Sequence, residues 1–162
     1  MKESMDLEKY IWTEMDFESM GWHDSIIHGI AFEGKSEFVL DIDYIFSWVK
    51  PSENHDAFKF WLSPCTLVFE NVYELKFDIE ISEPFNLQIL NLTRQNPRKP
   101  KNAEYIKREI EYDWTIESNN GEITFTSVGY KQYVREKPSL LNTQILNKND
   151  RKGISFERVI NK

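Results

Sequence analysis

The chain has 162 residues, of which 40% are hydrophobic and 14% aromatic, and its net charge is −7. This length predicts a single domain over residues 1–162, and this composition excludes an intrinsically disordered protein. A lone cysteine, Cys65, excludes an internal disulfide and a cysteine-based zinc cluster. No apolar run reaches the roughly 20 residues that a membrane helix needs, so we expect a cytoplasmic protein.

The charge is distributed unevenly along the chain. Residues 1–92 hold 6 basic and 18 acidic residues, a net charge of −12, whereas residues 93–162 hold 14 basic and 9 acidic residues, a net charge of +5. An acidic surface of this kind would attract a basic partner. The alternative is that the two halves fold against each other and neutralise much of the contrast.

The N-terminal third predicts one short helix and a β-hairpin. Leu7, Ile11 and Met15 have the spacing of a helical stripe, and a turn at residues 21–25 follows. Residues 26–33 and 37–49 read as paired strands joined by a short turn. In the second strand, six apolar residues occupy alternate positions, which predicts one aromatic-rich face: Phe38, Leu40, Ile42, Tyr44, Phe46 and Trp48.

The middle of the chain continues with short strands. A strand beginning at Phe58 is expected to bend or end at Pro64, and residues 65–72 then form another extended segment. Residues 73–81 alternate apolar and charged side chains, as expected of a strand with one wet face, and residues 87–92 form a shorter strand. Residues 93–102 are basic and contain two prolines, which predicts a mobile loop.

The C-terminal part predicts a hairpin and a less regular tail. Strands at residues 106–116 and 122–134 are joined by a turn whose Asn120-Gly121 pair favours positive φ. Residues 139–147 suit a short helix or a strand, and a closing strand begins at Ile154. Together these elements predict an all-β fold of about eight or nine strands, either an antiparallel sandwich or a curled, barrel-like sheet.

Motifs typical of the common enzyme classes are absent from the sequence. It has no phosphate-binding loop, no dinucleotide fingerprint, no His-Glu-x-x-His and no Gly-x-Ser-x-Gly. We therefore assign no catalytic residue, no cofactor and no metal ligand as the first interpretation. The basic residues at 94–101 have no interleaved aromatic residue, and the whole chain is acidic, so nucleic-acid binding is a minor option.

One polar group stands out as an alternative site. His23 and Asp24 lie in the turn before the first strand, and Asp41 and Asp43 share the face of residues 37–49 opposite the aromatic row. An imidazole with carboxylates suits a divalent metal or acid–base chemistry, so His23, Asp24 and Asp41 define an alternative polar site. The simpler interpretation is that Asp24 bonds its own turn and that Asp41 and Asp43 are solvated.

Two tryptophans lie on either side of the polar loop at residues 50–56. Trp48 and Trp61 could serve as contact residues for a partner, because tryptophan is enriched at binding hot spots, or simply pack in the core. His28 lies within an apolar strand, and a half-buried, hydrogen-bonded histidine is expected there rather than a ligand.

The first half of the chain resembles a known group of proteins. The segments that carry the likeness are residues 21–26, 40–44 with Trp48, residues 60–61 with Pro64, and residues 67–72. They resemble small uncharacterised bacterial all-β proteins, some of which look like the immunity proteins of polymorphic toxin systems. The resemblance implies a role in binding and neutralising a partner toxin.

The sequence therefore favours a non-enzymatic, acidic protein-binding module, of immunity type if the resemblance holds. Its expected partner is a basic protein, and its expected contact residues are Asp41, Asp43, Trp48 and Trp61. The alternative is a small-molecule or metal-binding β-barrel-like protein, or an enzyme, with its site near His23, Asp24 and Asp41. A homodimer formed across an exposed sheet edge is a third option.

Overall fold

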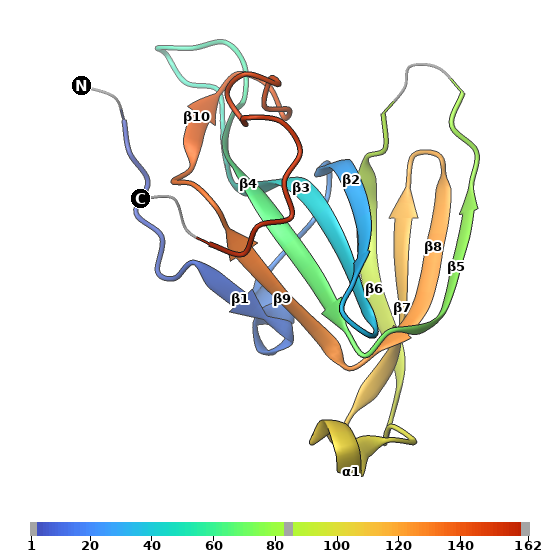
Figure 1. The fold of residues 1–162 in the computed structure, drawn as a ribbon. Coiled ribbons are helices and arrows are strands. Elements are labelled where there is room, and N and C mark those ends of the chain that lie inside the picture. The colour runs from blue at the N-terminus through green and yellow to red at the C-terminus, as the bar shows by residue number, and fades with distance from the viewer. Residues whose placement is uncertain (1–2, 83–85, 160–162) are drawn as a thin grey trace.

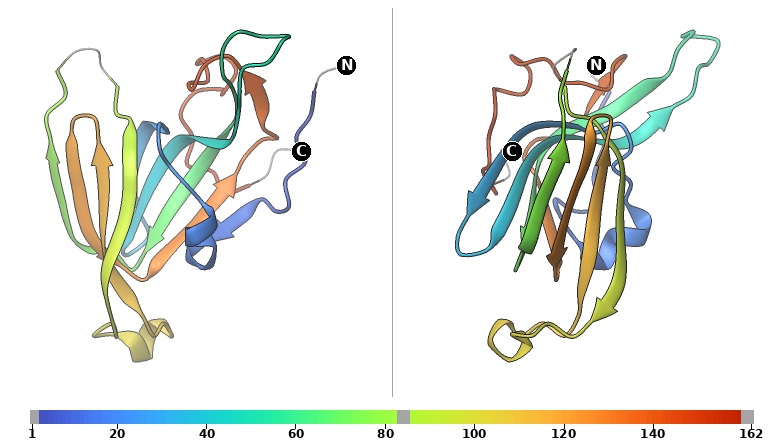
Figure 2. Two further views of the ribbon diagram at one scale, coloured as in Figure 1. Left: turned by 180° about the vertical axis from the view of Figure 1, so that it is seen from behind. Right: turned by 90° about the vertical axis from the view of Figure 1, so that its right-hand side faces the viewer.

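The computed structural model describes residues 3–82 and 86–159. They form two antiparallel sheets of six and four strands that face each other, as Figure 1 shows from the front and Figure 2 from behind and from the side. The all-β prediction is confirmed, and of its two architectures the sandwich is the correct one.

The six-stranded sheet has the order β1-β9-β4-β3-β2, with β10 also paired to β4. Its strands are β1 (Ile11–Thr13), β2 (Ile26–Glu33), β3 (Glu37–Val49), β4 (Lys59–Glu70), β9 (Gly129–Val134) and β10 (Ser139–Leu141). The four-stranded sheet has the order β5-β8-β7-β6. Its strands are β5 (Tyr73–Ile79), β6 (Ile89–Arg98), β7 (Glu111–Ser118) and β8 (Gly121–Ser127).

The aromatic row of β3 lies at the centre of the sandwich from Phe38 to Phe46, as predicted, but a bulge between Ile45 and Ser47 turns Trp48 to the opposite face, beside Phe60. Phe38, Leu40 and Ile42 are at most 1% exposed, and they face buried residues of the other sheet such as Trp114 and Phe125. Burying one such side chain contributes about 1.5–3 kcal/mol, so this row is a main source of the stability of the sandwich.

Pro64 neither bends nor ends its strand, which corrects the prediction of two separate segments. β4 runs without a break from Lys59 to Glu70 and pairs with β3 along its length. On its other edge, β10 pairs up to Leu62 and β9 begins at Cys65. The carbonyl of Pro64 faces that edge, where it accepts a hydrogen bond from the Arg135 amide. The N–H that Pro64 lacks would therefore point into the gap between β10 and β9, where no strand pairs with β4 and no hydrogen bond of the sheet is lost.

The N-terminus forms a strand and a 3₁₀ helix, so the predicted helix at Leu7–Met15 is wrong. β1 pairs with β9, and η1 (Glu14–Ser19) follows it directly. Thr13 caps η1 through a capping box with Asp16, whose carboxylate accepts from the Thr13 amide. A cap at Thr13 starts the helix only after this residue, which leaves Ile11 free to join the sheet.

The predicted strand at residues 122–134 is two strands in different sheets. β8 ends at Ser127, and β9 begins at Gly129, whose φ of 147° re-directs the chain. A Cβ atom on Gly129 would lie 2.7 Å from the side chain of Glu14, so only glycine fits. The apolar alternation changes phase at this crossing, from Ile123 and Phe125 to Val128 and Tyr130.

The prolines at residues 97 and 100 do not produce the predicted loop over residues 93–102. β6 extends to Arg98 because it is an edge strand, where a proline without an N–H is tolerated, and a bulge between Gln95 and Arg98 absorbs the irregularity. The predicted strand at residues 106–110 is also absent. The short helix α1 (Ala103–Ile106) lies there, on the hairpin that projects at the bottom of Figure 1.

After β10 the chain crosses the outer face of the six-stranded sheet. The predicted closing strand at Ile154 does not form, although this segment lies close to β2. Ile154 and Phe156 are so near to Gly29 that a Cβ atom there would come within 3.0 Å of both side chains. We call residues 142–159 the C-terminal segment. It covers the face of β3 that carries Asp41 and Asp43.

Candidate functional site

Asp41 and Asp43 are completely buried, which corrects the expectation that they are solvated residues available to a partner. They do share the face of β3 opposite the aromatic row, as predicted. The C-terminal segment covers that face, and it brings Arg151 to within 2.8 Å of Asp41 and 3.1 Å of Asp43. In this arrangement a partner could reach them only by displacing the segment.

Every oxygen of the two carboxylates accepts hydrogen bonds. Arg151 binds Asp41 in a bidentate manner, and Arg135 donates to the same carboxylate at 2.8 Å. Asp43 accepts from Arg151 and lies 2.7 Å from Nε2 of His28. The amides of Ser155 and Leu146 supply the remaining bonds. The cluster is therefore saturated, with no carboxylate oxygen free for a substrate or a metal.

The pKa of Asp41 reflects this pairing. Burial opposes the charged form, but the hydrogen bonds from Arg151 and the charge of Arg135 outweigh burial and hold the pKa below its ordinary value. Asp41 is thus ionised at neutral pH. A buried charge of this kind is tolerated only when it is paired, so the cluster fixes the C-terminal segment to the sheet.

Ion pairs between the two halves of the chain neutralise part of the charge asymmetry, as the alternative interpretation predicted. Six basic side chains of residues 93–162 form ion pairs with carboxylates of residues 1–92: Arg94, Arg108, Lys131, Arg135, Arg151 and Arg158. The sequence charge of the first half is thus a poor guide to the charge of the surface.

The alternative polar site at His23, Asp24 and Asp41 is not assembled. Nε2 of His23 lies 3.5 Å from Asp24, and the ring stacks on Trp48 with the centroids 6.4 Å apart. Asp24 accepts hydrogen bonds from the side-chain amides of Gln88 and Gln144, whereas Asp41 belongs to the arginine cluster. In the described part of the chain, no three His, Cys, Asp or Glu side chains are grouped as metal ligands would be.

Trp48 and Trp61 point to opposite faces of their sheet. Trp48 pairs with Phe60 across β3 and β4, and Phe60 precedes Trp61, so the two indoles cannot line one pocket. Trp48 is 43% exposed and packs edge-on against Phe58 and Phe60. It therefore remains accessible to a partner, whereas Trp61 lies partly buried beside Leu140 of β10.

The sandwich is open at the point where Phe32 of β2 and Phe77 of β5, two edge strands of the opposite sheets, lie near each other. Phe32 of β2 is at a core-facing position, stacked on Phe38, yet it is 69% exposed. Phe77 of β5 is 42% exposed, and its ring lies 6.4 Å from that of Phe32. Ile30, two residues before Phe32, is 37% exposed. We call these three residues and the strands that carry them the open edge.

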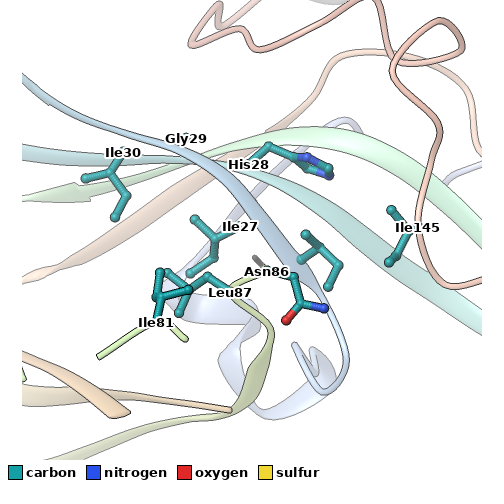
Figure 3. A pocket seen from close by; sticks show the side chains of 9 residues that line it. Ile27, His28, Gly29, Ile30, Ile81, Asn86, Leu87 and Ile145 are labelled. Carbon is teal, nitrogen blue, oxygen red and sulfur yellow. The ribbon is translucent and has the colours of Figure 1, made fainter. Parts of the chain in front are cut away.

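A hollow lies at each end of the open edge. The larger has a volume of about 570 Å³ and is mainly lined by apolar side chains, among them Ile27, Ile30, Ile81, Leu87 and Ile145 (Figure 3). The smaller, of about 220 Å³, is lined by Phe32, Phe38, Val72 and Leu75 together with the β2–β3 turn. Large exposed apolar surfaces of this kind usually mark binding sites.

The main chain of β2 is also available along part of its length. Residues 87–89 bond to its beginning, with the Ile27 amide donating to Leu87 and the Ile89 amide donating to Ser25. Beyond Ile27, β3 is the only strand within the described ranges that pairs with β2. Residues 29–33 therefore present one free edge beside an apolar surface.

A row of carboxylates begins on β5 and crosses the outer face of the four-stranded sheet. Asp78 of β5, Glu122 of β8 and Glu117 of β7 are direct cross-strand neighbours on the outer face of their sheet. All three are exposed, and no ion pair involves them within residues 3–82 and 86–159. Like charges side by side are unfavourable, so a basic partner would relieve this repulsion.

The sequence did not predict the arginine cluster around Asp41 or the open edge. Arg135 and Arg151 carried no pattern that linked them to Asp41, because they lie more than 90 residues away along the chain. Phe32 and Phe77 were expected as ordinary strand residues. The alternation of residues 73–81 predicts the face on which Phe77 lies, but it does not say which strands lie at the edges of the sheets.

Comparisons of this chain with protein families, with curated proteins and with solved structures gave no match. Among the described residues, no helix is long and apolar enough to cross a membrane. Functional inference therefore rests on the geometry of the open edge and of its surroundings.

Proposed function

We propose that this protein is a non-catalytic binding module that captures an extended, basic segment of a partner protein at the open edge. The observation that carries the proposal is the position of Phe32, which faces the core and is nevertheless 69% exposed between two edge strands. An aromatic side chain at such a position is available to anchor a partner.

The shape of the open edge favours an extended segment over a globular surface. A strand of the partner would pair with the free main-chain groups at residues 29–33, and its alternate side chains would enter the hollows on either side of Phe32. Main-chain bonds then supply affinity, and the hollows supply specificity.

The charge of the surroundings favours a basic partner. Glu74, Asp78 and Glu80 are exposed on or next to β5, with Lys76 as the single basic residue among them. Lysine or arginine residues flanking the apolar anchor positions of a partner would find these carboxylates at close range. Rim charges of this type mainly accelerate association and make binding sensitive to salt.

The narrower form of the proposal is an immunity-type protein, with a basic toxin domain as the partner. Its support is the resemblance of the first half of the chain, together with the acidic, aromatic character of the open edge. Once a partner is identified, co-expression in a host provides the test. Growth arrest by the partner alone, relieved by this protein but not by its Phe32→Ser variant, is the expected result.

The experiment for the general proposal is capture of a partner from the lysate of the source organism. Three baits are compared at low and high salt: the wild type, a Phe32→Ser/Phe77→Ser variant, and a Tyr105→Ser control. Tyr105 is 85% exposed on the β6–β7 hairpin, lines neither hollow of the open edge and serves as a matched aromatic. We expect one basic protein to be retained by the wild type and the control only, and to be released by salt.

Two outcomes would contradict the proposal. One is a partner that binds the Phe32→Ser/Phe77→Ser variant as tightly as the wild type in titration calorimetry of the purified proteins. The other is a light-scattering result in which the wild type is a dimer and the Phe32→Ser/Phe77→Ser variant is a monomer. In that case a second copy of this chain, rather than a different protein, covers the open edge.

A further inference from the structure

Arg94 is a charged residue at a position where the fold requires an apolar one. It pairs with Trp114 across β6 and β7, and the next inward pair is Leu92 with Ile116. Trp114 and Ile116 are each 1% exposed, so this face of the hairpin belongs to the core. A residue that breaks the local pattern in this way is expected at functional sites more than elsewhere.

Aromatic rings hold the guanidinium of Arg94 in place. Its Cζ atom lies 4.3 Å from the centre of the Phe17 ring and 4.5 Å from that of Tyr112. Phe17 belongs to η1, which the capping box at Thr13 fixes against the sandwich. The side chain is only 19% exposed. The rings cover the flat faces of the guanidinium, so its N–H groups, which point outward in its plane, remain free to form hydrogen bonds.

The donors of Arg94 have no hydrogen-bond partner in the described part of the chain. The nearest carboxylate is that of Glu18 at 3.8 Å, beyond hydrogen-bond distance, and Glu18 is itself 89% exposed. By contrast, Arg98, Arg135, Arg151 and Arg158 each donate at least two hydrogen bonds to side chains or main chain. Arg94 thus combines a fixed position with unused bonding capacity.

A pocket of about 370 Å³ opens beside Arg94, lined in part by Met15, Arg108, Ile110 and Tyr112. Its volume is within the range of small-molecule sites. Arg108 is paired with Glu14 and lies 3.6 Å from Glu70, so it adds little net charge. Met15 and Ile110 are 86% and 48% exposed and offer apolar contacts. The pocket therefore presents one available cation next to an apolar wall.

We infer that this pocket binds an organic anion with a single carboxylate attached to a flat apolar body. The fork of one guanidinium matches one carboxylate in a bidentate manner. A phosphate dianion fits less well, because Glu109 also lines the pocket and would repel the second charge. The site is distinct from the open edge, since none of the residues that line it lines either hollow of the open edge.

The test uses 1-naphthoate as the probe, with 1-naphthalenemethanol as the uncharged analogue and phenyl phosphate as the dianion. Binding is followed by the Nε–Hε resonance of Arg94 in proton–nitrogen correlation spectra, which is identified by its loss in Arg94→Lys. Affinities are measured by titration calorimetry for the wild type, Arg94→Gln, Glu18→Gln and a Lys101→Gln control on the same hairpin.

We expect 1-naphthoate to shift the Arg94 resonance. The wild type should bind 1-naphthoate at least about tenfold more tightly than it binds the alcohol, and at least about tenfold more tightly than Arg94→Gln binds 1-naphthoate. Each difference corresponds to the loss of a charged bidentate contact. Glu18→Gln should bind the probe more tightly than the wild type, by up to about fivefold, because an exposed competing carboxylate is removed. Lys101→Gln should match the wild type.

The inference is overturned if acid and alcohol bind equally, or if Arg94→Gln leaves the affinity for 1-naphthoate unchanged. It is also overturned if no binding occurs and Arg94→Gln makes the protein self-associate. That result would show that the inward-facing charge on β6 protects an edge strand against pairing with other chains.

Discussion

Arg151 and Asp41 form a bidentate ion pair, with Nη1 2.8 Å from Oδ2 and Nη2 2.8 Å from Oδ1, although 110 residues of chain separate them. The pair joins the C-terminal segment to the central strand of the larger sheet. It also gives β3 two buried faces, one apolar and one ionic, which is why the two aspartates are not available at the surface.

Replacing Arg151 by methionine should destabilise the protein by about 3–5 kcal/mol, because the buried carboxylates of Asp41 and Asp43 lose their shared partner. Chemical denaturation measures the free energy of unfolding. Lys152→Met is the matched control, since the Lys152 side chain is 74% exposed, and it should change stability by no more than about 0.5 kcal/mol. Equal stability of the two variants would contradict a structural role for the cluster.

The cluster should also make the protein sensitive to acid. Because the pKa of Asp41 is lowered in the folded state, its contribution is complete above the ordinary value of 3.8 and is lost as the pH falls through the lower folded value. In Asp41→Asn that dependence should be absent, so its stability at neutral pH is lower but changes less below about pH 4. Parallel profiles for the wild type and the variant would argue against this linkage.

Cys65 should be unreactive in the native protein. Its side chain is completely buried, and burial raises the pKa of the thiol well above its ordinary value. A thiol reagent such as 5,5′-dithiobis(2-nitrobenzoate) should label it only after unfolding, at a rate that rises with urea concentration. Rapid labelling in buffer would show that the sandwich opens locally at β4.

Gly129→Ala should destabilise the protein by about 1–3 kcal/mol, since φ is 147° there and the new Cβ would collide with the side chain of Glu14. Gly21→Ala is a suitable comparison, because nothing lies within 4 Å of a Cβ atom at that position. We expect the thermal midpoint to fall clearly in the first variant and to stay nearly constant in the second. Similar midpoints would mean that the β8–β9 crossing tolerates a side chain.

Sequence patterns correctly predicted the strands and turns that depend only on residues close together along the chain. The alternation from Phe38 to Phe46 correctly gave the core face of β3, and the hairpin at residues 118–121 formed as expected. For Trp48 the alternation was wrong, because the bulge between Ile45 and Ser47 reverses the face of the residues that follow it. Pro64 and Pro97 were misjudged for a single reason. The cost of a proline depends on which edge of a strand it occupies, and that is a property of the sheet rather than of the sequence around the residue.

The candidate site could not be predicted because its parts are distant in sequence. Asp41 seemed solvated because its covering segment follows more than 100 residues later. Phe32 was expected only as part of the strand at residues 26–33, because nothing in that strand reveals that β2 is an edge. Arg94 was counted only as part of a basic loop, whereas the pairing of β6 with β7 turns it towards the core.

The central claim, that the open edge captures an extended basic segment, is tested most directly by selecting peptides from a random display library on the immobilised protein. The account predicts enriched sequences in which apolar residues alternate and lysine or arginine flanks them. It also predicts that they bind the wild type and Tyr105→Ser but lose at least about tenfold in affinity on Phe32→Ser. Selection that enriches nothing, or peptides whose affinity is unchanged in Phe32→Ser, would contradict it.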